Sequence, residues 1–192
     1  MIVLILGLVV FLGTHSVRVF ADGFRARTIE RLGAMRWKGA YTVLSVAGFV
    51  LIVWGYGLAR AEPVVLWNPP PWTRYLAVLL TIPAFVLFAA AKGPITRIKA
   101  AVGHPTVAGV KVWAIAHLIS NGTLADVLLF GGFLAWAVAD YASARRRDRA
   151  AGRSYAAGPI SRDVVVVVAG LAAWAVFALW LHAWLIGVRP LG

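Results

Sequence analysis

The chain has 192 residues, of which 61% are hydrophobic and only 14% are charged, and its mean hydropathy is +0.83. A soluble domain has about 45–50% apolar and about 25% charged residues, so this composition excludes a soluble globular domain and predicts an integral membrane protein. The chain has no cysteine, which excludes disulfides, thiolate metal sites and a thiolate haem ligand.

A helix needs about 20 apolar residues to cross the hydrocarbon core of a bilayer, and six apolar segments are close to this length. They cover residues 2–20, 38–58, 72–91, 104–120, 123–143 and 163–185. The first lacks the basic flank and cleavage site of a signal peptide, so we interpret it as a retained helix. The fourth is the shortest, and a re-entrant turn near residues 120–122 is the alternative to a crossing. The predicted fold is all-α, an integral membrane bundle of about six transmembrane helices.

Basic residues lie mainly in the loops after the first, third and fifth segments. These residues are Arg25, Arg27, Arg31, Arg36 and Lys38, then Lys92, Arg97 and Lys99, then Arg145, Arg146, Arg147, Arg149, Arg153 and Arg162. The opposite side of the membrane has only Arg60, Arg74 and Arg189. Since Lys and Arg collect in cytoplasmic loops, this alternation predicts six crossings with both termini outside the cytoplasm. It also accounts for the net charge of +12, so we expect a lipid bilayer and no nucleic acid as partner.

Ionisable residues at membrane depth are candidate functional residues. His15 lies in GTHSVR near the cytoplasmic end of the first segment, and His182 lies in WLHAWLIGVRPLG near the outer end of the sixth. Each is either a packed, hydrogen-bonded histidine or a metal ligand. Asp126 stands at the start of the fifth segment, where a carboxylate complements the helix dipole, so we expect it to be structural.

The stretch HPTVAGVKVWAIAHLISNG, residues 104–122, combines an apolar span with two histidines. Residues at every fourth position form a stripe on one helix face, here Gly109, Trp113, His117 and Asn121. Gly109 leaves room beside Trp113, either for close helix packing or for a flat ligand. Asn121 is a candidate acceptor for the second ring nitrogen of His117. His104 precedes Pro105 and marks a helix start.

Lys111 lies about 120° around the helix from His117 and faces other neighbours. Asp140, on the following helix, is also in the cytoplasmic half. We therefore predict a structural Lys111–Asp140 pair, because an unpaired charge in a membrane is unfavourable. Snorkelling of Lys111 toward the cytoplasm and a catalytic lysine are the alternatives.

Histidines on several helices of one small bundle indicate a metal or haem site, because neutral imidazole is a common metal ligand and haem is often held by histidine. The chain contains no HExxH, CxxCH, GxSxG, GxGxxG or P-loop motif. No catalytic triad is visible, so hydrolase chemistry is not indicated.

The chain resembles the NnrU family of bacterial membrane proteins. The resemblance rests on GTHSVR at 13–18, HPTVAGVKVWAIAHLISNG at 104–122, LLFGGFLAWAVAD at 128–140 and the ending WLIGVRPLG, and it covers nearly the whole chain. It implies a single NnrU-like transmembrane domain over residues 1–192 in the bacterial inner membrane, where the termini predicted from the basic residues would be periplasmic. It also implies an association with nitrogen-oxide metabolism in denitrifying bacteria.

The family in turn resembles 15-cis-zeta-carotene isomerase, a membrane enzyme that uses haem b. By motif, His15 and His117 correspond to the haem ligands of that enzyme, which implies haem b in this chain with Trp113 and Asn121 beside it. The isomerase has a cysteine three residues before the second histidine. This chain has Ala114 at that position, so a switch to a thiolate ligand is excluded.

The predicted topology leaves the choice of ligand pair open. It places His15 in the cytoplasmic half of the bilayer and His117 in the outer half. The pairs His15 with His104 and His117 with His182 are therefore alternatives, as is a protein without haem.

A second resemblance concerns membrane methyltransferases that use S-adenosylmethionine, whose HP-x3-G element is similar to HPTVAG. Those enzymes carry an acidic pair after the next helix, where this chain has Arg145, Arg146 and Arg147. Three functions follow as hypotheses: a haem protein with a redox or isomerase-like role, a methyltransferase, and a non-enzymatic accessory protein for denitrification enzymes. A small hydrophobic or nitrogen-oxide ligand fits the first, and the oligomeric state stays open.

Overall fold

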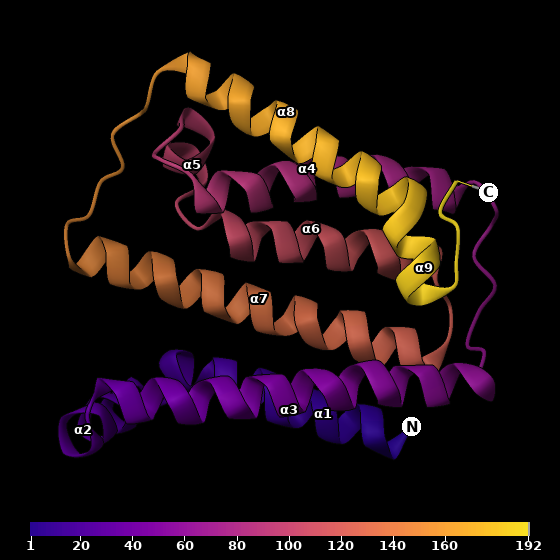
Figure 1. Ribbon diagram of the computed structural model, residues 1–192, viewed down its shortest axis with the longest axis horizontal. Helices are drawn as coiled ribbons and strands as arrows, with labels where there is room; N and C mark the ends of the chain where they lie inside the picture. Colours follow the sequence, from indigo (N-terminus) through magenta and orange to yellow (C-terminus); the bar gives the residue numbers. More distant parts are fainter. Residues whose placement is uncertain (192) are drawn as a thin grey trace. The chain divides into compact units, whose positions relative to one another are not determined.

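The computed structural model describes residues 1–191, and helices make up most of them (Figure 1). Extended pairing in this part of the chain is confined to an isolated antiparallel bridge between Val65 and Thr123. The chain divides into two compact units. The first unit comprises Met1–Trp67 and Gly122–Asp140, and the second comprises Asn68–Asn121 and Tyr141–Gly192. The single domain expected from the sequence stays a prediction.

Five of the described helical stretches are long and apolar enough to cross a membrane. They are α1 (Ile2–Phe20), α3 (Ala34–Ala61), α4 (Thr73–Lys92), α7 (Leu124–Ala150) and the continuous run of α8 (Ile160–Val176), the π-helix η1 (Phe177–Leu181) and α9 (His182–Ile186). A shorter apolar helix, α6 (Pro105–Ser120), is the sixth. These helices match the six predicted segments, so the predicted fold class is confirmed and the chain is a membrane protein.

Two of the predicted loops contain helices. α2 (Asp22–Leu32) has an aspartate in its first turn and Arg31 in its last, which complements the helix dipole, and Gly33 ends it at φ 85°. α5 (Arg97–Val102) begins at Thr96, whose hydroxyl accepts a hydrogen bond from the backbone N–H of Lys99 at 2.9 Å. A capping side chain therefore supports α5, whereas α2 has no side-chain cap at its start, and the charge of these basic connections alone predicts neither helix.

In the first unit, α1 packs directly against α3. A Cβ atom added to Gly7 would lie 2.6 Å from the backbone nitrogen of Ile52, and one added to Gly55 would meet the backbone of Leu4. Small residues at such crossings allow two helix backbones to approach closely, which is how membrane helices gain contact area without a hydrophobic driving force.

The start of α7 in the first unit is held by a reciprocal cap. The Asp126 carboxylate accepts hydrogen bonds from the backbone N–H of Thr123 at 3.0 Å and from its hydroxyl at 2.6 Å, while the Thr123 hydroxyl accepts from the Asp126 N–H at 3.3 Å. The Tyr56 hydroxyl of α3 donates to the other carboxylate oxygen at 2.6 Å. The predicted structural role of Asp126 is thus confirmed.

In the second unit, α4 packs against both α6 and α8. The contact with α8 is close at Gly170, where an added Cβ would lie 2.6 Å from the Cα of Val86. The Trp174 indole N–H of α8 donates to the Thr81 hydroxyl of α4 at 3.0 Å. A polar contact of this kind joins two apolar helices at a specific rotation.

Candidate functional site

His15 of α1 is a half-buried residue of the first unit. Its Nδ1 lies 2.7 Å from the backbone carbonyl oxygen of Phe11. Because a carbonyl oxygen only accepts hydrogen bonds, Nδ1 carries the proton. A neutral imidazole in this tautomer has its lone pair on Nε2, which is the form in which histidine binds a metal.

Aromatic side chains from three helices surround the His15 ring. The Phe11 ring stacks on it at a centroid distance of 4.2 Å, Tyr41 of α3 lies at 5.1 Å, and Trp136 of α7 stands edge-on at 6.0 Å with an interplanar angle of 88°. We call these four residues the His15 aromatic cluster. It orients one imidazole within an otherwise apolar, aromatic wall.

His117 of α6, in the second unit, has the same local geometry. Its Nδ1 lies 2.8 Å from the carbonyl oxygen of Trp113, so this ring also carries a proton on Nδ1. The Trp113 ring lies 5.1 Å from the His117 ring. The expected role of Asn121 as hydrogen-bond acceptor for Nδ1 is wrong, because the Trp113 carbonyl accepts that bond. The Asn121 amide instead donates to the His117 carbonyl at 2.8 Å, which satisfies a carbonyl at the helix end.

Gly109 serves helix packing, one of the two roles that the sequence allowed. A Cβ added there would lie 2.6 Å from the Phe88 ring and 3.1 Å from the carbonyl oxygen of Ala84, both on α4. The space beside this glycine is therefore taken by the neighbouring helix. Along this stripe, Gly109 contacts α4, and Trp113 is the aromatic neighbour of His117.

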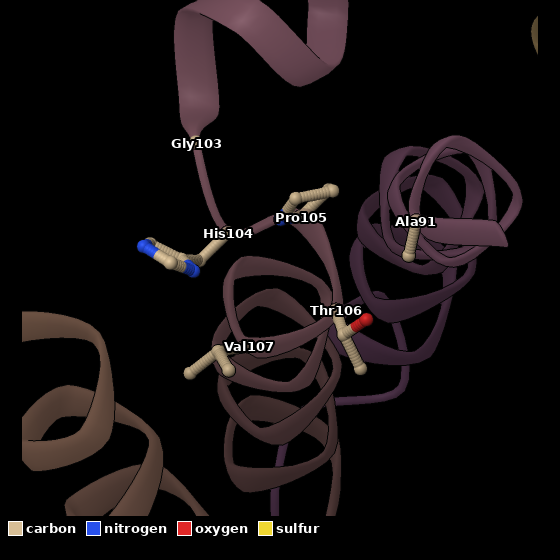
Figure 2. A pocket seen from close by; sticks show the side chains of 6 residues that line it. All are labelled: Ala91, Gly103, His104, Pro105, Thr106 and Val107. Carbon is tan, nitrogen blue, oxygen red and sulfur yellow. The ribbon is translucent and has the colours of Figure 1, made fainter. Parts of the chain in front are cut away.

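His104 immediately precedes α6 in the second unit. Its Nε2 lies 2.8 Å from a carboxylate oxygen of Asp148 in α7, and the Tyr155 hydroxyl donates to the same oxygen at 3.0 Å. Residues 103–107 and Ala91 line a small cavity of about 200 Å³. Figure 2 shows the His104 ring directed away from Ala91. The Nε2 of His104, one of the alternative haem ligands, is thus hydrogen-bonded to the Asp148 carboxylate.

His182, the other alternative ligand, directly follows the π-helix η1. Its Nδ1 lies 2.8 Å from the Val188 carbonyl oxygen, and the Phe177 ring stands edge-on at 5.8 Å. π-Helical turns are frequent at functional sites. His182 therefore shares the Nδ1-protonated form with His15 and His117.

The four histidines divide between the two units. His15 belongs to the first, and His104, His117 and His182 belong to the second. Among residues 1–191, no group of three or more His, Asp or Glu side chains gathers as a metal site. The pairing of His15 with His117 stays a prediction, because the two residues belong to different units.

Lys111 has an aromatic partner within the second unit. Its Nζ lies 3.7 Å from the centroid of the Tyr141 ring, a cation–π distance. Tyr141 also donates through its hydroxyl to the Val102 carbonyl at 2.8 Å. Asp140, the residue before Tyr141, belongs to the first unit, so the predicted Lys111–Asp140 pair stays a prediction.

Sequence reasoning missed Tyr41 and Trp136 as neighbours of His15. Trp136 lies within LLFGGFLAWAVAD, one of the stretches that carry the family resemblance, but its spacing to His15 is too large for a helix pattern to connect them. Its indole Nε1 is buried and has no hydrogen-bond partner among residues 1–191. An unpaired buried donor in a native structure calls for an explanation.

A model of the NnrU protein family matches residues 3–190, which is nearly the whole chain. No curated protein and no solved structure matches it.

Proposed function

The chain belongs to the NnrU family, and from this premise we propose that it is an inner-membrane haem b protein with a redox or isomerase-like role linked to nitrogen-oxide metabolism. The carrying observation is that His15 and His117 each donate Nδ1–H to the carbonyl four residues earlier. Such a hydrogen bond fixes the tautomer and the ring orientation of a metal-ligating histidine.

Two further features of these residues support a haem site. Each of the two histidines has an aromatic neighbour within its own unit, Phe11 for His15 and Trp113 for His117. The buried Trp136 Nε1 beside His15 is a donor whose acceptor is not supplied by residues 1–191. A porphyrin with polar edge groups needs an axial ligand, apolar contacts and a hydrogen-bond donor. The His15 imidazole, the aromatic rings beside it and the Trp136 indole N–H are groups of these three kinds.

Within this proposal, His15 and His117 would hold the iron, and the haem would supply one-electron or double-bond isomerisation chemistry. The protein's own contribution is the orientation of the two imidazoles and the exclusion of water by apolar helices. A small hydrophobic molecule or a nitrogen oxide is the corresponding substrate class.

Absorption spectroscopy of protein purified in detergent after expression with ample haem tests the proposal. We expect a Soret band that His117→Ala abolishes or strongly shifts, and that His15→Ala converts to a five-coordinate form. His182→Ala is the matched control, since it removes a histidine with the same Nδ1 hydrogen bond, and it should change the spectrum little.

Other outcomes would redirect the assignment. Loss of haem in His182→Ala, with an unaltered spectrum in His15→Ala, would replace the proposed ligand pair. No Soret band in the wild-type protein would overturn the haem site. In that case measurable binding of S-adenosylmethionine would favour a methyltransferase, and no binding would favour an accessory role.

A further inference from the structure

Within the His15 aromatic cluster, the buried indole N–H of Trp136 has no hydrogen-bond acceptor among residues 1–191. An indole N–H acts only as a donor, and tryptophan usually finds a partner for it when buried. Leaving a buried donor unpaired costs the desolvation of that group, so a native site that keeps one is poised to donate to something else.

Trp136 borders the same imidazole as the other members of the His15 aromatic cluster. Its ring stands edge-on to His15 at 6.0 Å, while Phe11 stacks on the imidazole at 4.2 Å and Tyr41 lies at 5.1 Å. The Nδ1 of His15 is already bound to the Phe11 carbonyl. A group that binds through the remaining ring nitrogen of His15 would therefore be a neighbour of the tryptophan that borders the same imidazole.

We infer that Trp136 is a positioning residue of the haem site, whose Nε1–H donates to an acceptor oxygen of the group bound at His15. This inference rests on the proposed function. The acceptor is either a carboxylate at the edge of the porphyrin or the oxygen of a small exogenous ligand beside it. Both share one chemistry, an oxygen acceptor presented to a buried indole N–H.

The substitution Trp136→Phe removes the N–H and keeps an aromatic ring. If a porphyrin carboxylate is the acceptor, this variant should raise the haem dissociation constant about tenfold or more, because hydrogen bonds to charged groups are the stronger class. The thermal stability of the haem-free protein should stay equal or rise, since an unpaired donor is removed from it. Trp54→Phe, at an exposed position of α3 in the same unit, is the matched control and should leave haem affinity unchanged.

Two further measurements separate the two acceptors. Iron etioporphyrin lacks carboxylates, so a carboxylate acceptor predicts that wild type and Trp136→Phe bind it equally well. A small-ligand acceptor predicts instead an unchanged haem dissociation constant. In the five-coordinate His15→Ala background, where carbon monoxide can take the open position on the reduced haem, it predicts a carbon monoxide stretching frequency that shifts when Trp136→Phe is added.

Three results would overturn the inference. One is a Trp136→Phe variant with wild-type haem affinity that also leaves the carbon monoxide band unshifted in the His15→Ala background. Another is equal destabilisation of the haem-free and haem-bound forms, which would mean that the indole has a structural acceptor. A wild-type protein without a Soret band would remove the proposed function itself, and is distinguished from the other two by that band.

Discussion

His104 and Asp148 form a hydrogen-bonded pair that joins the start of α6 to the last turns of α7, with 2.8 Å between Nε2 and Oδ2. The Asp148 side chain is only 5% exposed. Its carboxylate also receives the Tyr155 hydroxyl at 3.0 Å and lies 3.7 Å from Arg145 and 3.8 Å from Arg153. A carboxylate with this many donors organises the connection that follows α7.

Replacing Asp148 with Asn should lower the melting temperature in detergent, because an amide cannot accept all of these hydrogen bonds. His104→Ala should also lower it, and the double variant should lose less than the sum of the two, since both changes remove the same contact. Arg153→Ala is the control, because this exposed partner at 3.8 Å should contribute little. Strict additivity of His104→Ala and Asp148→Asn would rule out the coupling.

Gly55→Leu should weaken the packing of α1 on α3. Even a Cβ at this position would meet the backbone of Leu4, so a larger side chain must push the helices apart, at a cost of about 1–3 kcal/mol or more. Gly57→Leu is the matched control two residues later, where an added Cβ meets nothing within 4 Å. It should be neutral or slightly stabilising, because leucine favours helix over glycine. Thermal unfolding that ranks the two variants in the reverse order would contradict the close crossing.

Tyr56→Phe should destabilise the first unit by about 1–2 kcal/mol, because it removes a donor to the buried Asp126 carboxylate. Asp126→Ala should cost more, since it also removes the cap at the start of α7. Unfolding followed by circular dichroism in detergent measures both. Equal stability of Tyr56→Phe and wild type would show that the 2.6 Å contact adds nothing to folding.

Lys111→Met should destabilise the protein, because it removes the cation over the Tyr141 ring. Two double-variant cycles then separate its partners. Coupling with Tyr141→Leu is expected from the cation–π contact, and coupling with Asp140→Asn is expected from the charge pair predicted by the sequence. Additivity in the second cycle alone would dispose of the pair with Asp140 and leave the aromatic contact.

A reporter that is active only in the periplasm should be active when it is fused to the C-terminus, and a reporter that is active only in the cytoplasm should be inactive there. This expectation follows from the basic residues that follow the first, third and fifth apolar segments. A fusion after α2 should behave oppositely and serves as the internal control. An active cytoplasmic reporter at the C-terminus would mean that α6, the shortest of the apolar helices, does not complete a crossing.

The sequence by itself determined the number and approximate limits of the apolar helices. A bilayer requires about 20 consecutive apolar residues for each crossing, so this information is local. The same local logic placed Asp126 in the first turn of α7 and identified the histidines as the polar residues to explain. It did not reveal α2 and α5, because these short helices lie in hydrophilic connections, which lack the long apolar run that marks a membrane crossing.

The tertiary structure alone decided which side chains meet. Helices that are apolar on all sides carry little periodicity to indicate which face contacts a neighbour, so the closeness of Gly109 to Phe88 and of Trp136 to His15 was not readable from spacing. The acceptor for His117 was likewise misassigned to Asn121, because a carbonyl four residues earlier competes with any side chain within one helix. Contacts between residues far apart in the chain depend on helix rotation and close packing, and these are set by the whole fold.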